Sequence, residues 1–169
     1  MKHFLNSFKY AVGGIFFCIK YERNMRIHIV ITIYVLYFST FYEFTRVETI
    51  LLILTCVAAV SLEMVNTAIE VVIDKVSPNY HTLAKIGKDV AAGAVLIATI
   101  AAVAIGIMLF WNTEMFVKIW FYFTGSVING LLMLGSVLLA VFFINSGKKR
   151  KARIRKKVEQ GQEKEKNEK

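Results

Sequence analysis

Apolar residues dominate four stretches of the chain, and charged segments separate these stretches. The apolar runs cover residues 29–42, 47–62, 90–110 and 119–144. A helix that crosses a bilayer needs about 17 to 25 mostly apolar residues, so the last two runs are long enough and the first two are short or interrupted. The pattern predicts four membrane-crossing helices.

The first 20 residues have a different pattern. Phe4, Phe8, Val12, Ile15 and Ile19 recur at spacings of three and four, which places them on one face of a helix. Such an amphipathic helix lies on a membrane surface rather than crossing the membrane.

The chain is therefore expected to be an all-α integral membrane protein. Its first part, residues 1–110, is predicted to form one domain, with an N-terminal amphipathic surface helix over 4–20 and spans at about 27–45, 47–74 and 86–110. A further transmembrane helix is predicted within 111–147.

Composition and charge support a membrane location and suggest an orientation. Of the 169 residues, 56% are hydrophobic, against about 45 to 50% in soluble domains. The net charge of +9 is concentrated in residues 1–28, 75–89 and 145–169, and only Arg46 and Lys118 lie elsewhere among the basic residues. By the positive-inside rule we expect a multi-pass protein of the cell membrane with both termini in the cytoplasm.

The C-terminal segment 148–169 is predicted to be a disordered cytosolic tail. It opens with "KKRKARIRKK", in which eight of ten residues are basic. A basic cluster next to a membrane helix is typical of binding to anionic lipid headgroups. Aromatic residues do not alternate with the basic ones, so we expect no nucleic acid partner.

Cys18 and Cys56 are the only cysteines. One lies in the amphipathic segment and the other inside a predicted span, so a structural disulfide is not expected. No cysteine or histidine pattern has the spacing of zinc ligands. We interpret both cysteines as small apolar core residues.

The stretch "LEMVNTAIEVVID" places acidic residues at the end of an apolar run. At 3.6 residues per turn, Glu63, Glu70 and Asp74 fall within about 40° of one another, and Asn66 lies about 60° from Glu63. If the span begins near Val47, Glu63 is about 24 Å along it, close to the inner edge of a hydrocarbon core about 30 Å thick. The polar stripe is therefore expected where the membrane meets the cytosol.

Two other polar clusters are predicted at the same membrane face. Glu22 lies in "KYERNMRIH", and "HTLAKIGKD" contains His81, Lys88 and Asp89. Carboxylates, a lysine and an amide are the groups that hold magnesium, neutralise phosphate and accept a proton in phosphoryl transfer. The spacing alone equally allows solvated or ion-paired side chains. Walker A, protein-kinase and nucleophile-elbow motifs are absent from the sequence.

Four stretches in a fixed order resemble the small prokaryotic diacylglycerol kinase family, in particular its undecaprenol kinase branch. They are "SFKYAVGGI", "ERNMRIH", "EMVNTAIEVVID" and "HTLAKIGKDVAAGAVL", and the similarity covers roughly residues 4–110. The resemblance implies a homotrimer with active sites at the cytosolic interface between subunits. It also implies Mg²⁺-dependent transfer of the ATP γ-phosphate to a lipid alcohol in the membrane.

The resemblance further implies roles for individual side chains. These are Glu63 as general base, Glu22 and Glu70 as metal ligands for Mg²⁺, Asn66 and Lys88 at the phosphates, Tyr10, His81 and Asp89 at the nucleotide, and Asp74 ordering the site through hydrogen bonds.

The chain departs from the family in its fourth predicted helix, because the family usually ends soon after its third span. That addition brings the simple trimer packing into question. Undecaprenol, giving undecaprenyl phosphate, is the expected acceptor, and diacylglycerol, giving phosphatidic acid, is the alternative. A catalytically silent membrane adaptor and an ion-conducting assembly are alternatives of another class. The complete set of motif residues disfavours the first, and the almost wholly apolar spans disfavour the second.

Overall fold

The computed structural model describes residues 2–77 and 81–146, and this part of the chain folds into helices without strands. The predicted basic tail at 148–169 and residues 78–80 lie outside the described residues. The six helices are α1 (Lys2–Tyr21), α2 (Arg23–Ser39), α3 (Arg46–Val76), α4 (Thr82–Phe110), α5 (Thr113–Thr124) and α6 (Val127–Asn145).

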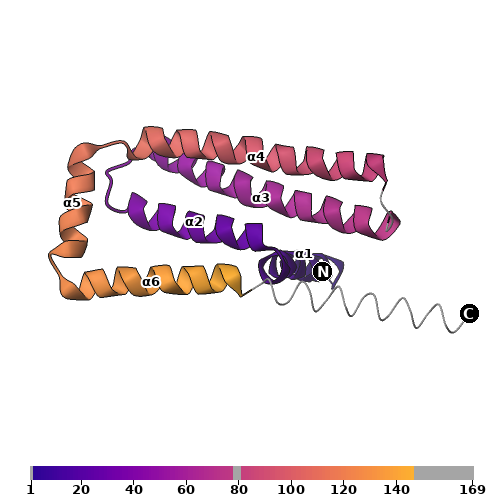
Figure 1. Ribbon diagram of the computed structural model, residues 1–169, viewed down its shortest axis with the longest axis horizontal. Helices are drawn as coiled ribbons and strands as arrows, with labels where there is room; N and C mark the ends of the chain where they lie inside the picture. The colour runs from indigo at the N-terminus through magenta and orange to yellow at the C-terminus, as the bar shows by residue number, and fades with distance from the viewer. Residues whose placement is uncertain (1, 78–80, 147–169) are drawn as a thin grey trace, which may run out of the picture.

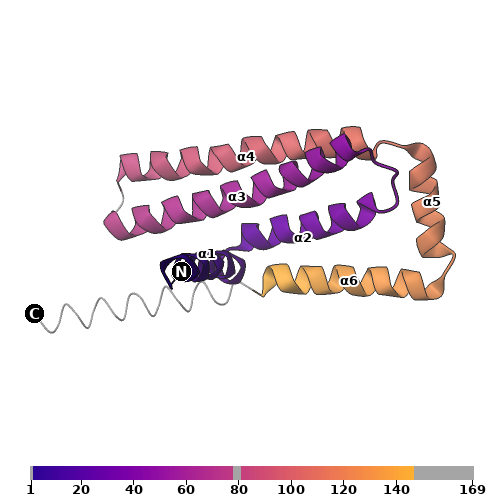
Figure 2. The same cartoon turned by 180° about the vertical axis from the view of Figure 1, so that it is seen from behind.

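Four helices run lengthwise and two run across them. α2, α3, α4 and α6 lie along the long axis, and α1 is seen nearly end-on beside the start of α2 in both views (Figures 1 and 2). α5 crosses the opposite end, between the end of α4 and the start of α6 (Figure 1). The two ends of the molecule are therefore built differently.

Three of the described helices are long and apolar enough to cross a membrane: α3, α4 and α6. This confirms the expected all-α integral membrane fold. α2 has 17 residues and a length of about 26 Å. α3 has 31 residues and reaches about 46 Å. Because the hydrocarbon core is about 30 Å thick, α3 extends well beyond it at one end.

One face of α3 carries every buried residue of that helix. Leu52 and Ala59 supply its apolar half, and Glu63, Asn66 and Thr67 continue the same stripe. The spacings of seven, four and three between Leu52, Ala59, Glu63 and Asn66 keep them on one side of a helix. α4 packs along α3, with Ala91 and Val95 buried. The α3 face therefore changes from apolar to polar along its length.

The segment predicted as a single fourth helix is two helices in the structure. α5 ends at its C-cap, Gly125, and α6 begins after the N-cap Ser126, whose hydroxyl accepts a hydrogen bond from the Asn129 amide. A Cβ atom at Gly125 would lie 2.7 Å from the Phe121 carbonyl oxygen. The continuous apolar composition hid this break, which turns the chain from α5 into α6.

Aromatic side chains fill the end of the molecule near α5. Phe41 packs against Tyr122 and Phe123 with ring centroids 5.2 and 6.3 Å apart. Tyr42 packs on Phe110 at 5.0 Å and donates a hydrogen bond to the Phe110 carbonyl oxygen. Aromatic side chains of this kind are enriched where a membrane protein meets the headgroups.

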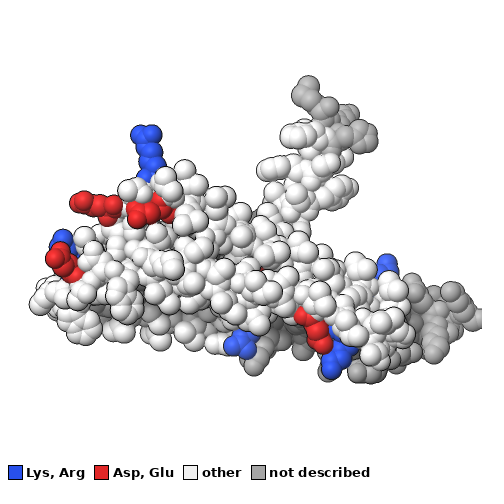
Figure 3. Space-filling model, turned by 90° about the horizontal axis from the view of Figure 1, so that it is seen from above, with Lys and Arg blue, Asp and Glu red and all other residues white. Residues whose placement is uncertain are grey.

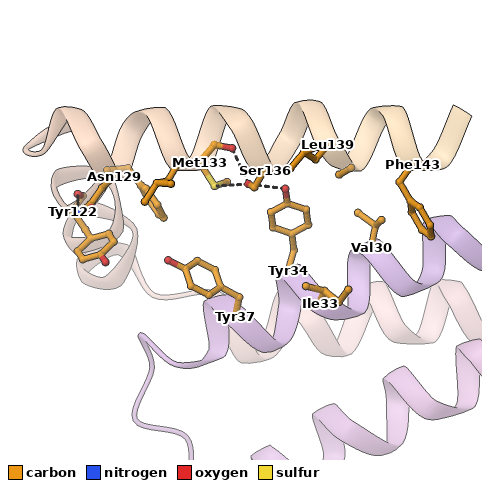
Figure 4. A pocket seen from close by; sticks show the side chains of 13 residues that line it. Val30, Ile33, Tyr34, Tyr37, Tyr122, Asn129, Met133, Ser136, Leu139 and Phe143 are labelled. Carbon is orange, nitrogen blue, oxygen red and sulfur yellow. Dashed lines mark hydrogen bonds between the residues drawn. The ribbon is translucent and has the colours of Figure 1, made fainter. Parts of the chain in front are cut away.

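A groove separates α6 from α2 along the middle of their length (Figure 4). It has a volume of about 530 Å³ and is lined mainly by apolar and aromatic side chains. The Tyr34 and Ser136 hydroxyls meet across it at 2.9 Å (Figure 4). This hydrogen bond joins α6 to α2 at mid-length.

Replacing Leu52 by Ala should destabilise the protein strongly. Leu52 is only 3% exposed, so its loss leaves a cavity that costs about 2 to 4 kcal/mol in the free energy of unfolding. Leu54→Ala is the matched control, because Leu54 is 59% exposed and its change should cost less than about 1 kcal/mol. Unfolding in detergent, followed by circular dichroism, measures both. Equal losses would contradict the assignment of Leu52 to the core and Leu54 to the surface.

Candidate functional site

Charged side chains are set apart on the visible surface in two groups. One group lies at the α5 end and the other in the opposite half, and most of the surface between them is uncharged (Figure 3). The sequence-predicted site residues of α3 belong to the polar half of that helix, away from its start at Arg46. This is the end that projects beyond a membrane-thick segment of α3.

The polar half of the α3 stripe is almost completely buried. Glu63, Asn66 and Thr67 are 2%, 6% and 3% exposed. The Asn66 side-chain amide donates to a Glu70 carboxylate oxygen at 3.4 Å. The Asn66 carbonyl oxygen has no hydrogen-bond partner within the described part of the chain. A buried acceptor left in this state is costly, so its position suits a ligand that donates a hydrogen bond or a cation.

Glu22 enters the same region from the junction of α1 and α2. It is the N-cap residue of α2, with extended backbone angles, and its amide donates to the Cys18 carbonyl oxygen at 2.8 Å. The half-buried Glu22 side chain therefore projects where the chain turns from the surface helix into α2.

The pKa of the Cys18 thiol depends on carboxylates from both the α1–α2 junction and α3. Burial raises the pKa of Cys18, the neighbouring Thr67 hydroxyl lowers it, and the charges of Glu22 and Glu63 raise it. Both carboxylates therefore act on one sulfur atom, although they come from segments about 40 residues apart in the sequence. The structure brings Glu22 and Glu63 into one neighbourhood around Cys18, with Thr67 beside it.

Arg26 is a buried residue of α2 next to the α1–α2 junction. It is 2% exposed. Its guanidinium donates to the carbonyl oxygens of Ile19 and Lys20, at the end of α1, and of Phe143, near the end of α6. The last carbonyls of a helix lack partners within the helix, and a cation is favourable there.

Asp74 and Lys88 form an ion pair between α3 and α4. The Lys88 side chain is 35% exposed and that of Asp74 is 58% exposed. The pair lies close to the connection between α3 and α4, about one turn from Glu70 and two turns from Asn66 along α3. An exposed pair of this kind adds about 0 to 1 kcal/mol of stability, so its main effect is to fix where the Lys88 ammonium lies.

The remaining predicted nucleotide residues lie on the outside of the described structure. Tyr10 is 76% exposed on α1. His81 is the exposed N-cap of α4, and Asp89 is exposed on that helix. A single chain does not enclose them around Glu63, and their roles stay predictions.

The oxygen-rich donor set fits a hard divalent cation. Within residues 2–77 and 81–146, no three side chains of His, Cys, Asp and Glu lie close enough to enclose a metal ion. Mg²⁺ is usually held by one or two carboxylates together with waters and substrate phosphates. Glu22 and Glu70, with the unpartnered Asn66 oxygen, provide donors of this chemistry.

Sequence reasoning missed Arg26, Cys18 and Thr67 as members of the site. The position of Arg26, four residues after Glu22 at the start of the same helix, was a usable signal, because residues at this spacing share a helix face. Cys18 is buried, as expected of a small apolar core residue, but neither Cys18 nor Thr67 gave a signal that it lies beside the site. Their burial depends on how α1 crosses α3, which one-dimensional periodicity does not specify.

Comparisons with known proteins give a consistent result. A profile of the family described as prokaryotic diacylglycerol kinase matches residues 9–110. A diacylglycerol kinase of Synechocystis is 43% identical over 103 residues, which are 60% of this chain, and the match spans only about three fifths (59%) of that protein. An undecaprenol kinase of Bacillus subtilis is 34% identical over 110 residues, 65% of this chain and 89% of that protein.

A third relative, a diacylglycerol kinase of Escherichia coli K12, is 40% identical over 63 residues, 37% of this chain and 52% of that protein. No solved structure gives a significant match. The family profile includes every predicted site residue from Tyr10 to Asp89, and it stops at residue 110, where α4 ends.

The alkylation rate of Cys18 should report the charge of Glu63. Because the Glu63 charge raises the pKa of the Cys18 thiol, Glu63→Gln should lower that pKa, increase the thiolate fraction and speed the reaction with iodoacetamide at pH 7.5. The background is Cys56→Ala, so that Cys18 is the only thiol. Glu70→Gln is the control, since Glu70 is not among the charges that act on Cys18. An equal acceleration in both variants would mean that Glu63 and Cys18 are not neighbours.

Proposed function

The chain belongs to the prokaryotic diacylglycerol kinase family, and we propose that it is a membrane lipid kinase that transfers the ATP γ-phosphate to a lipid alcohol. The observation that carries this proposal is the burial of Glu63 in the polar half of a membrane-length helix, beside the second carboxylate Glu22. A reaction between a membrane lipid and a water-soluble nucleotide needs its reactive groups where the membrane meets the cytosol.

The proposed orientation places the Glu63 end at the cytoplasmic face. The basic segments 1–28, 75–89 and 145–169 then all lie on the ATP side, as the positive-inside rule requires. α1 lies across the bundle at this end (Figure 1), as expected of a helix in the headgroup layer. The aromatic cluster near α5 falls at the opposite interface. The basic residues of 148–169 would bind anionic headgroups.

Glu63 is the proposed general base. It is the deepest carboxylate of the α3 stripe, so it is best placed to meet a hydroxyl held at the level of the lipid headgroups. Accepting the hydroxyl proton leaves an alkoxide-like oxygen that attacks the γ-phosphorus in line, while the bond from that phosphorus to the β–γ bridging oxygen breaks and ADP leaves. Burial of Glu63 also limits competition from water at this step.

Glu22 and Glu70 are the proposed ligands for Mg²⁺. When bound, the ion neutralises charge on the ATP phosphates. Glu70 lies two turns beyond Glu63 along α3, and Glu22, the N-cap residue of α2, acts on the Cys18 thiol together with Glu63. The hydrogen bond from Asn66 orients the Glu70 carboxylate, and the Asn66 carbonyl oxygen remains available to the ligand.

Lys88 is proposed to contact a phosphate group of ATP. Asp74 is proposed to position the Lys88 ammonium before ATP binds. Their ion pair places the Lys88 ammonium close to the connection between α3 and α4. An incoming phosphate group would compete with Asp74 for the same cation. Asp74 would thus act through Lys88 and would not touch the nucleotide.

Tyr10, His81 and Asp89 are proposed to contact the nucleotide within a homotrimer. Their exposure in one chain is compatible with a site completed by a neighbouring subunit. We retain this assembly as part of the proposal.

Two acceptors are supported by specific similarities. Undecaprenol is the leading acceptor, and the undecaprenol kinase of Bacillus subtilis matches over 89% of its length. Diacylglycerol is the second, since the more similar Synechocystis protein is named a diacylglycerol kinase. Both reactions use the same groups, so the mechanism does not depend on the choice.

Glu63→Gln should abolish turnover while MgATP still binds. The change removes a proton acceptor and keeps the size of the side chain, so kcat should fall by about 10² to 10⁴, whereas the dissociation constant for MgATP should stay within about threefold. Transfer of labelled phosphate gives the first quantity, and calorimetric titration gives the second. Loss of nucleotide binding by the folded variant would contradict the role of Glu63 as base.

The acceptor is decided by presenting undecaprenol and diacylglycerol separately in mixed micelles with labelled ATP and Mg²⁺. We expect faster phosphorylation of undecaprenol, and no transfer to either lipid by Glu63→Gln. Preference for diacylglycerol would keep the mechanism and change the product. Failure of the folded wild-type protein to phosphorylate either lipid would favour the adaptor alternative.

A further inference from the structure

α6 lies outside the region that matches the family, yet it contacts the α1–α2 junction. The family profile ends at residue 110, and α6 covers Val127–Asn145. The contact is made at Phe143, in the last turn of α6. Its carbonyl oxygen accepts a hydrogen bond from Arg26 at 3.3 Å, and its ring centroid lies 5.6 Å from the guanidinium carbon.

The same guanidinium holds the end of α1. Arg26 donates from Nε to the Ile19 carbonyl oxygen at 2.6 Å, and its other terminal nitrogen donates to the carbonyl oxygen of Lys20. A planar guanidinium with five N–H donors in a fixed fork can serve three carbonyls at once. The Arg26 side chain of α2 therefore links the end of α1 to the end of α6.

The backbone held in this way is the one that presents Glu22. Glu22 follows Lys20 by two residues, and its amide donates to the Cys18 carbonyl oxygen at 2.8 Å. Movement of the Ile19 and Lys20 carbonyls would move the Glu22 backbone with them. Because the fork of Arg26 is held from its other side by Phe143, the position of Glu22 is sensitive to α6.

We propose that α6 positions the metal-binding corner of the kinase through the contact of Phe143 with Arg26, which fixes the end of α1 and thereby Glu22. This inference rests on the proposed function. It makes Arg26 and Phe143 positioning residues, and it gives the helix added beyond the family core a role in MgATP binding.

A second contact between α6 and α2 provides an internal comparison. The Tyr34–Ser136 hydrogen bond lies two turns from Arg26 along α2, inside the groove (Figure 4). Removing it loosens the docking of α6 without touching Arg26. The proposal therefore predicts different effects at the two contacts.

The test compares four variants of the whole chain in detergent, the fourth of which is Arg26→Lys. Phe143→Leu removes the ring that faces Arg26. Phe142→Leu makes the same change at the neighbouring position, which is 73% exposed. Tyr34→Phe removes only the hydrogen bond to Ser136. The readouts are KM for MgATP, kcat, the alkylation rate of Cys18 without nucleotide in the Cys56→Ala background, and the unfolding temperature.

We expect Phe143→Leu to raise KM for MgATP about fivefold, the effect of losing a partly desolvated cation–π contact, while kcat changes less than about twofold. Cys18 should be alkylated faster in this variant, because the end of α1 is less firmly held. Phe142→Leu and Tyr34→Phe should match the wild type in KM and in alkylation. Arg26→Lys, which keeps the charge and loses the fork, should shift both quantities in the same direction as Phe143→Leu.

Two results would overturn the proposal. One is a Phe143→Leu variant with a lower unfolding temperature but wild-type KM and alkylation rate, which would make the contact purely structural. The other is an equal effect of Phe143→Leu and Tyr34→Phe, which would trace the change to α6 docking in general. If the wild type phosphorylates no lipid, the proposed function fails, and the alkylation rates still decide whether Phe143 positions the α1–α2 junction.

Discussion

The guanidinium of Arg26 donates hydrogen bonds to the terminal carbonyl oxygens of two helices, and the arrangement of the polar end of the molecule depends on these bonds. Arg26 is 2% exposed and bonds carbonyl oxygens of α1 and α6. Its place in the first turns of α2 is unfavourable for that helix, whose N-terminus already carries partial positive charge. Glu22 at the N-cap of α2 and the carbonyl ends of α1 and α6 offset this cost. The three helices can meet closely at this corner because a single cation serves them all.

Burial of Glu63 imposes a second constraint on the same corner. A carboxylate with 2% exposure is stable only where polar partners or a cation surround it. The chain meets this requirement by grouping the buried polar side chains of α3 at one end of its packing face. α1 crosses α3 at that end and supplies Cys18 beside Thr67. The apolar remainder of α3 packs with α4 and needs no polar partner at membrane depth.

The helical periodicity of the sequence predicted which α3 residues share a side, but it did not predict their burial. Glu63, Glu70 and Asp74 occur on one stripe, as their spacing requires, and the structure buries the first, half-buries the second and exposes the third. Glu63 lies at the level of α3 where Cys18 of α1 is beside Thr67, whereas Asp74 lies near the exposed end of the helix. Similarly, the apolar composition of the run from residue 119 outweighed the signal of Gly125 and Ser126, a helix stop and an N-cap residue, where one helix ends and the next begins. Local patterns therefore located the elements, and contacts between distant segments decided how the site is enclosed.

The added helices show how a membrane core can acquire a new element without disturbing its chemistry. α5 lies across the aromatic end, which is the end away from Glu63, so it introduces no new group near the α3 stripe (Figure 1). α6 returns along α2 and contacts the polar corner at Phe143, whose carbonyl near the helix end can accept a further hydrogen bond even though Ser146 also donates to it. A carbonyl has two lone pairs, so both donors are satisfied. An element that joins through a backbone acceptor and an aromatic ring requires no change in the acidic and basic residues of the site. This agrees with a family match that covers residues 9–110 and ends before α5 and α6.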